Sequence, residues 1–230
     1  ANLAYVTRAN QYPKGVVMPA GIRGQLLRWE REKEELYIIE DDYDSEFRYY
    51  GKPIPALQGL DQSGKVIYIG TFSKAIAPAI RVGYMVLPPK LLEKYKKNVT
   101  AFSCSVSRID QKVLTLFLAE GHFERHLNRM RNLYKEKHDL LLENIRKNIP
   151  GASVSGEGAG VHVIVNFHIS EKEKFEQRLR ERGVAIYPLS FYYIEGKPQE
   201  EQYILGFTRM KKEDMIEGTR EIGKVLSTIK

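Results

Sequence analysis

Residues 66–74 read Val-Ile-Tyr-Ile-Gly-Thr-Phe-Ser-Lys. An apolar strand, expected at 66–69, runs here into a polar turn that ends at the amine of Lys74. A second apolar strand, expected at 36–40, runs into the acidic segment Glu-Asp-Asp-Tyr-Asp at 40–44. Because both strands carry polar side chains where they end, we expect a carboxylate, a phenol and an amine to meet at one edge of a sheet.

A lysine amine presented in this way suits Schiff-base chemistry, because an amine condenses with an aldehyde. A neighbouring carboxylate and phenol suit the ring of a bound aldehyde cofactor. The combination of these groups is typical of a pyridoxal 5′-phosphate (PLP) pocket.

Strand and helix patterns alternate through the first half of the chain, as in an α/β layer. A long helical region at 105–148, with a break at Gly121, leads into a second part. We therefore predict a first domain at 1–105 and a second, smaller α+β domain at 106–230. Strands are expected at 3–7, 36–40, 66–69, 81–87, 161–167, 184–188 and 203–207, and helices at 20–33, 105–148, 170–182 and 211–229.

Composition sets broad limits. The chain has 230 residues, 43% of them hydrophobic, and a net charge of +7. The Lys and Arg residues alternate with Glu along helices, which favours solvated helix faces over direct DNA binding. No apolar run predicts a membrane span or a signal peptide, and the single Cys104 suits a reducing cytoplasm. The five histidines are scattered, so no metal site is predicted.

Three segments carry a resemblance to a known family. They are 39–49 (IEDDYDSEFRY), 66–88 (VIYIGTFSKAIAPAIRVGYMVLP) and 11–15 (QYPKG). These segments resemble the aminotransferase-like domain of MocR-type bacterial transcription regulators, in which a GntR-like winged helix is fused to a fold-type I PLP domain. The resemblance implies an α/β fold, with part of a fold-type I PLP-dependent transferase large domain followed by a smaller α+β C-terminal domain.

The same resemblance implies roles for particular side chains. Lys74 would form a Schiff base with PLP, and Asp41 would keep the pyridine nitrogen protonated. Tyr43, two residues beyond Asp41 in a segment expected to be extended, would bond the 3-oxygen of the cofactor. The phosphate would be bound by Arg81, Thr71 and Ser73.

Several residues depart from the family pattern or lack an assigned role. Where the family turn usually reads Thr-Pro-x-His-Gln, residues 7–11 read Thr-Arg-Ala-Asn-Gln. Many aminotransferases clamp the substrate carboxylate with an arginine at the position of Ile204, and strand alternation would aim the nearby Arg209 at the opposite face. We expect the remaining acids of the acidic segment to order the loop through salt bridges with Arg48 or Lys52. These acids are Asp42, Asp44 and Glu46.

The resemblance also implies that this chain is the C-terminal portion of a longer protein. A winged helix and the early strands of the large domain would precede it, so DNA would be bound through that preceding part. The sheet of such a portion is expected to expose edge strands and apolar surface unless a partner covers them. A homodimer is expected from the family.

Three functions remain open. The first is a PLP-binding module that senses an amine, an amino acid or PLP itself and controls attached DNA-binding domains. The second is a PLP-dependent aminotransferase acting on an amino acid or amine, in which Lys74 also moves a proton. The third is an interaction domain without cofactor, against which the set of Lys74, Asp41, Tyr43 and Arg81 argues.

Overall fold

The computed structural model of the chain describes residues 2–99, 102–196, 198 and 201–229. These residues fold into two compact units. Unit 1 consists of Ala1–Gln11 and Val17–Met130, and unit 2 of Tyr12–Val16 and Arg131–Lys230. The compact units therefore divide within a helix at residue 130, and a domain boundary at 105/106 stays a prediction.

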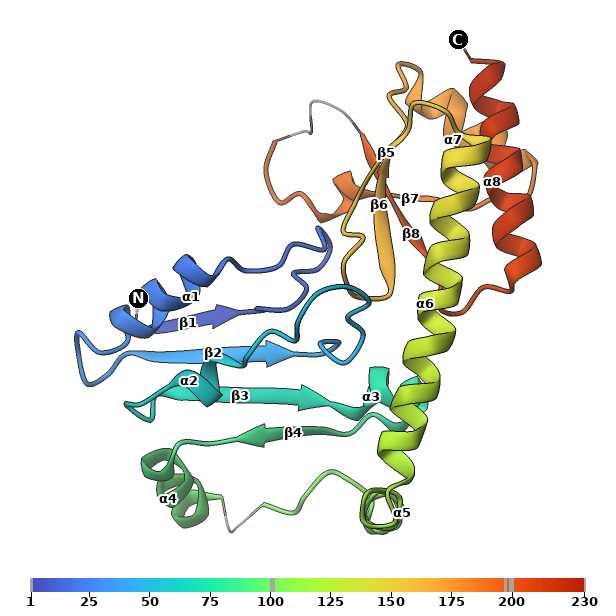
Figure 1. Ribbon diagram of the computed structural model, residues 1–230. Helices are drawn as coiled ribbons and strands as arrows, with labels where there is room; N and C mark the ends of the chain where they lie inside the picture. The colour runs from blue at the N-terminus through green and yellow to red at the C-terminus, as the bar shows by residue number, and fades with distance from the viewer. Residues whose placement is uncertain (1, 100–101, 197, 199–200, 230) are drawn as a thin grey trace. The chain divides into compact units, whose positions relative to one another are not determined.

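Unit 1 is built on a four-stranded sheet with the order β1-β2-β3-β4. The first three strands are parallel and β4 is antiparallel to β3, as Figure 1 shows. Its elements in chain order are β1 (Leu3–Val6), α1 (Ala20–Trp29), β2 (Tyr37–Asp42), α2 (Leu57–Leu60), β3 (Val66–Thr71), α3 (Phe72–Ala75), the 3-10 turn η1 (Pro78–Ile80), β4 (Gly83–Val86), α4 (Pro89–Asn98), α5 (Arg108–Ala119) and the start of α6 (His122–Asn148).

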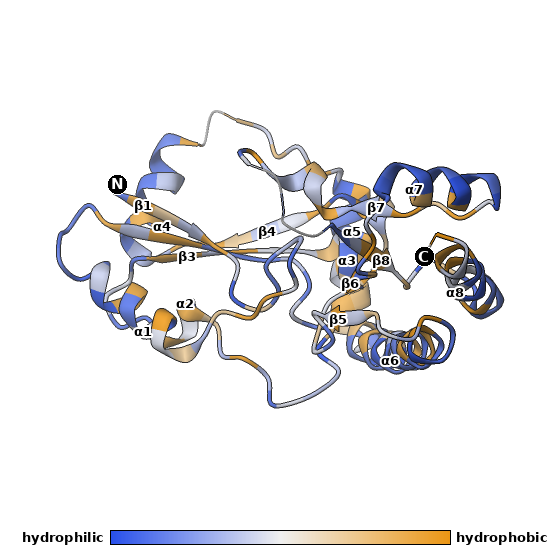
Figure 2. Ribbon diagram, turned by 90° about the horizontal axis from the view of Figure 1, so that it is seen from above, coloured by the Kyte–Doolittle hydropathy of each residue, from blue (hydrophilic) through white to orange (hydrophobic). Residues whose placement is uncertain are grey.

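One face of this sheet forms the core of unit 1. Ile38 of β2 and Val66 of β3 are buried against Leu57 of α2, and side chains of β1 and α1 pack on the same cluster. Figure 2 shows α1 and α2 on the same side of the sheet. Burial of the alternate residues of β2 explains why the strand pattern was readable in the sequence.

The opposite face of the sheet carries exposed apolar side chains. Leu3 and Tyr5 of β1 are 51% and 63% exposed, and Met85 of β4 is 48% exposed. These residues share a face because paired positions in neighbouring strands point the same way. The exposed face and the edge strand β1 agree with the expectation of uncovered apolar surface.

Two glycines lie where another residue would strain the backbone or displace a neighbouring side chain. Gly121 has φ +68° and separates α5 from α6, as the sequence predicted. At Gly70 of β3, a Cβ would lie 2.3 Å from the ring of Tyr84 on β4, so a larger residue there would displace this ring. Helix α4 was not predicted, because two prolines, Pro88 and Pro89, follow the strand expected at 81–87. Pro89 is instead an early residue of the helix, a position at which proline fits.

Unit 2 contains a second four-stranded sheet, with the order β5-β6-β8-β7 and antiparallel pairing. The rings of Phe167, Phe175 and Tyr203 pack with centroids 5.5 to 5.8 Å apart and form its aromatic core. Strand β5 was not predicted, because it is short and polar. The elements after α6 are β5 (Ser153–Ser155), β6 (His162–Asn166), α7 (Lys172–Glu181), β7 (Tyr187–Pro188), the 3-10 turn η2 (Leu189–Tyr192), β8 (Gln202–Gly206) and α8 (Lys212–Ser227).

Across the described residues, no helix combines the length and the apolar character needed to cross a bilayer.

Candidate functional site

Lys74 lies where the sequence placed it, just beyond β3. Thr71 ends the strand and caps the short helix α3, and its Oγ1 accepts a hydrogen bond from the backbone N–H of Ser73 at 3.1 Å. Lys74 is in this single turn and its side chain is exposed. Within the described residues its amine has no hydrogen bond or ion pair, so it is available to an incoming group.

Three of the predicted residues meet at one corner beside Lys74. Arg81 follows η1 in the left-handed conformation, with φ 50° and ψ 32°, and its Nη1 donates to Ser73 Oγ at 3.4 Å. Thr71 Oγ1 donates to the carbonyl of Val82 at 3.3 Å. A guanidinium and two hydroxyls are thus gathered in one place, which is a donor set suited to a phosphate.

Asp41 lies near the end of β2, on the same face of the sheet as Tyr5 of β1. The Tyr5 hydroxyl donates to Asp41 Oδ2 at 2.5 Å. That hydrogen bond, together with burial, raises the pKa of Tyr5 to about 12. Oδ1 of Asp41 has no hydrogen bond within the part of the chain that the structure describes, so one carboxylate oxygen remains open to a donor.

Tyr43 is placed differently from the prediction. Strand β2 ends at Asp42, and Tyr43 begins the bend that follows it. The prediction placed the Tyr43 side chain on the same side as Asp41 by strand alternation. That argument is wrong here, because alternation holds only within a strand and Tyr43 lies beyond β2. The Tyr43 hydroxyl donates to the backbone carbonyl of Asn10 at 2.5 Å.

A buried ion-pair network, which the sequence did not reveal, joins Arg8, just beyond β1, to two acids of β2. Arg8 Nη2 donates to Asp42 Oδ2 at 2.7 Å, and Arg8 Nε lies 2.5 Å from Glu40 Oε1, an ion pair without hydrogen-bond geometry. Glu40 also accepts the backbone N–H groups of Leu57 and Gln58 at the start of α2, at 2.8 and 2.9 Å. The expected pairing of Asp42 with Arg48 or Lys52 is therefore wrong.

Asp44 is bound in a similar way. Asn10 Nδ2 donates to Asp44 Oδ2 at 2.5 Å, and both side chains are buried. The expected salt bridge of Asp44 with Arg48 or Lys52 is also wrong. Asn10 stands where the family pattern usually has a histidine. In this chain its side-chain amide makes a buried hydrogen bond to Asp44.

Burial dominates the ionisation of Asp44. It raises the pKa of this carboxyl from its ordinary value of 3.8 to about 7, even though the hydrogen bond from Asn10 and the charge of Lys74 both act to lower it. The charges of Asp42 and Glu46 add to the rise. Asp44 therefore lies within electrostatic reach of the candidate Schiff-base lysine.

Asp44 is expected to make the stability of the chain depend on pH. Because its pKa is raised in the folded state, the native chain holds a proton that the unfolded chain releases. The resulting stabilisation is present below about pH 4 and is lost as the pH rises through about 7. Between pH 5 and 8 we expect a loss on the order of 3 kcal/mol. Urea unfolding of the Asp44→Asn variant should lack this dependence.

The matched control for this variant is Asp110→Asn, which removes an exposed carboxyl on α5. The control should keep the pH dependence of the wild type. Equal slopes in the wild type and in Asp44→Asn would contradict the assignment to Asp44.

Ile204 and Arg209 both lie in unit 2. Ile204 of β8 is buried in an apolar cluster with Ile164 and Leu189. The position at which many aminotransferases carry an arginine is therefore part of a hydrophobic core here. Arg209 lies in a bend beyond β8, so strand alternation does not determine its direction, contrary to the prediction.

Comparison with known proteins identifies the family of the chain. The family model for aminotransferase class I and II matches residues 13–202. The chain belongs to this family. Membership agrees with the α/β unit 1 and with the lysine that follows β3.

Two curated relatives are regulators. The chain is 41% identical, over 96% of its length, to the uncharacterized HTH-type transcriptional regulator YhdI of Bacillus subtilis (strain 168), of which it covers 47%. It is 36% identical, over 96% of its length, to the probable rhizopine catabolism regulatory protein MocR of Rhizobium meliloti, of which it covers 45%. The chain thus spans about half the length of these relatives. The predicted resemblance to MocR-type regulators is confirmed.

A solved aminotransferase has the same fold. The structure of LysN, the alpha-aminoadipate aminotransferase of Thermus thermophilus, complexed with N-(5'-phosphopyridoxyl)-L-leucine, matches 98% of this chain and 58% of that one. The TM-score is 0.81 and the identity is 26%. The predicted fold class, a partial fold-type I transferase followed by a smaller α+β part, is confirmed.

The side chains of unit 1 fit a phosphorylated pyridine aldehyde. Lys74 offers an exposed amine without a partner in the described residues, and Asp41 has an open carboxylate oxygen for a ring N–H. Arg81 and Ser73 offer donors for a phosphate.

Proposed function

We propose that this chain is the PLP-binding, effector-sensing part of a bacterial MocR-type transcription regulator, with Lys74 as the Schiff-base residue. One observation carries the proposal. The identity of 41% to an HTH-type regulator extends over 96% of a chain in which Lys74, Asp41 and Arg81 occupy the ends of neighbouring strands. A shared fold alone would not carry a function.

Each site residue has a defined task. PLP supplies an aldehyde and an electron-accepting ring when it is bound. Lys74 would contribute the amine. Asp41, whose Oδ2 accepts a hydrogen bond from the Tyr5 hydroxyl, would accept the ring N–H with its open oxygen. Arg81, Ser73 and Thr71 would bind the phosphate. Tyr43, at the bend after β2, would bond the 3-oxygen in exchange for its hydrogen bond to the Asn10 carbonyl.

The partners follow from the regulator relatives. The effector would be an amine, an amino acid or PLP itself, received where the exposed Lys74 amine stands. DNA is bound by a winged helix that precedes this part in the whole protein, as the name of the HTH-type relatives suggests. We further propose that the protein is cytoplasmic and acts as a homodimer.

A second candidate is a working aminotransferase. The match to the aminotransferase family favours it. The buried apolar environment of Ile204 weakens it, because no cation stands at that position to bind the carboxylate of an ordinary amino acid.

One experiment distinguishes the sensing site from the aminotransferase. PLP is first titrated into this chain, and its binding is followed by visible absorbance. A panel of amines and amino acids is then added, with 2-oxoglutarate as the amino acceptor. A sensing site predicts a stable spectral change without product, whereas an aminotransferase predicts steady formation of glutamate. A gel shift with a longer protein that carries both the winged helix and this chain completes the test. DNA affinity that does not respond to PLP or to any amine of the panel contradicts the regulator function.

A further inference from the structure

Unit 2 contains a cavity of about 470 Å³ between β7 and β8 on one side and α6 and α8 on the other. This volume falls within the range of small-molecule binding sites. Thr219 adds no open polar group to the wall, because its hydroxyl donates to the Ile216 carbonyl and accepts from Asn148 Nδ2. The wall is otherwise mostly apolar, with Leu141, Ile186, Met215 and Ile222 among its residues.

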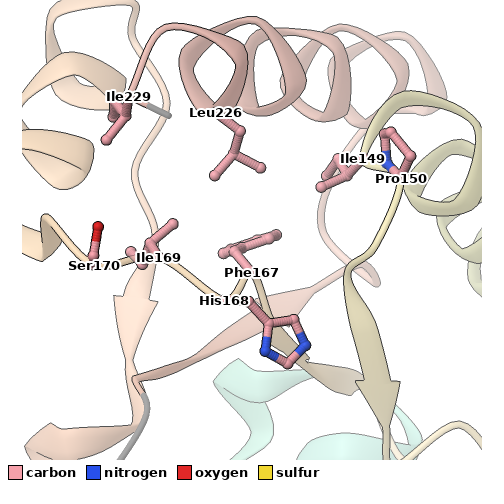
Figure 3. A pocket seen from close by; sticks show the side chains of 8 residues that line it. All are labelled: Ile149, Pro150, Phe167, His168, Ile169, Ser170, Leu226 and Ile229. Carbon is pink, nitrogen blue, oxygen red and sulfur yellow. The ribbon is translucent and has the colours of Figure 1, made fainter.

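A smaller cavity of unit 2 provides a contrast. It has a volume of about 110 Å³, and Leu226 of α8 and Phe167 face each other across it in Figure 3. This volume is well below that of typical ligand sites. Its other walls come from Ile149, Pro150, His168, Ile169, Ser170 and Ile229, so it offers a ligand little room and neither a lysine nor an arginine.

Arg209 stands at the larger cavity and is the charged residue of its wall. Its backbone is fixed, because Lys137 Nζ of α6 donates to the carbonyls on both sides of it, those of Thr208 at 2.8 Å and Met210 at 2.7 Å. The Arg209 side chain is exposed and has no hydrogen bond or ion pair with any residue that the structure describes. The Arg209 guanidinium and an apolar chamber therefore lie together, and no carboxylate of the described residues pairs with this guanidinium.

We propose that this cavity is a second binding site, which takes small organic anions with an apolar body. The carboxylate of the ligand pairs with the Arg209 guanidinium, which can donate two parallel hydrogen bonds to it. The hydrocarbon body fills the chamber between the sheet edge and α8, where its burial contributes to affinity. The positive charge of Arg209 favours anionic ligands, and the apolar wall favours ligands with a hydrocarbon body.

Gly218 of α8 provides a sharp test, because it lines the cavity and a Cβ added there would meet no atom within 4 Å. A leucine at this position is expected to occupy the chamber, and replacing a glycine inside a helix should raise the Tm. Binding of 4-phenylbutanoate, measured by calorimetry, should be lost in Gly218→Leu. In Arg209→Gln its affinity should fall roughly tenfold or more. The affinity of the neutral 4-phenylbutanamide should stay unchanged in Arg209→Gln.

Two controls separate this site from others. Gly21→Leu places the same side chain at an open helical glycine of unit 1 and should bind as the wild type does. Lys74→Ala should also bind 4-phenylbutanoate normally, which makes the result independent of the proposed PLP site. Absence of binding to the wild type at millimolar 4-phenylbutanoate overturns the proposal. Equal binding by the wild type, Arg209→Gln and Gly218→Leu overturns it as well.

Discussion

Replacement of Lys74 by alanine is expected to abolish covalent capture of PLP by this chain. Only a primary amine condenses with the aldehyde, and borohydride then fixes the product as a stable secondary amine. In the wild type, reduction should add one cofactor mass to the peptide that contains Lys74. The Lys74→Ala variant should gain none at the same PLP concentration, and its absorbance should be that of unbound or non-covalently bound PLP.

Two matched variants make this result specific. Lys74→Arg keeps the positive charge beside Asp44 but removes the condensing amine, so it should also fail to be labelled. Lys90→Ala removes an exposed lysine whose ion pair with Glu34 is open to solvent, and it should be labelled like the wild type. Equal labelling of the wild type and Lys74→Ala would show that the modification is adventitious. A wild type without any label at saturating PLP would contradict the proposed function.

The strands and the main helices could be predicted because their signals are local. The buried side chains of β2 alternate with less buried ones, and Gly121 breaks the helical region as its backbone angle requires. The missed elements lack such signals, since β5 has three residues and α4 begins at a proline. The phosphate-binding role of Thr71, Ser73 and Arg81 was implied by the family resemblance, and the structure brings Ser73 and Arg81 into contact.

The buried network was not predictable from local patterns, because it depends on the register between β1 and β2. Each paired residue of β2 lies 34 positions after its partner in β1, as in Val6 and Glu40. The contacts of Arg8 with Asp42 and of Asn10 with Asp44 keep the same separation beyond the strand ends. The sequence did contain a signal. Arg8 and Asn10 each stand 34 positions before an acid, Asp42 and Asp44. This spacing indicates contacts only once the register between β1 and β2 is known.

The network matters for the candidate site because of where Asp42 lies. It stands between Asp41 and Tyr43, and it accepts hydrogen bonds from Arg8, Ser45 and Tyr68. These bonds fix the backbone at the point where β2 ends. The orientation of both flanking side chains therefore depends on a residue that would not itself contact the cofactor.

Removal of the Arg8 side chain is expected to destabilise the chain strongly. In Arg8→Ala the carboxylates of Glu40 and Asp42, both buried, lose their cation, and an uncompensated buried charge typically costs about 3 to 5 kcal/mol. Urea unfolding at pH 7 should show a loss of this size. Arg28→Ala, which removes an exposed arginine of α1, should change stability by less than about 0.5 kcal/mol.

A double-mutant cycle with Asp42→Asn shows whether the loss comes from the ion pair. If the pair is responsible, Arg8→Ala should cost less in the Asp42→Asn background, with a coupling of roughly 1 kcal/mol or more. Additive effects would assign the loss to packing of the Arg8 stem instead. Because Asp42 also fixes the end of β2, Arg8→Ala at temperatures where it remains folded should bind PLP more weakly while keeping Lys74 as the labelled residue. Unchanged PLP affinity in the folded variant would show that the network supports the fold without positioning Asp41 and Tyr43.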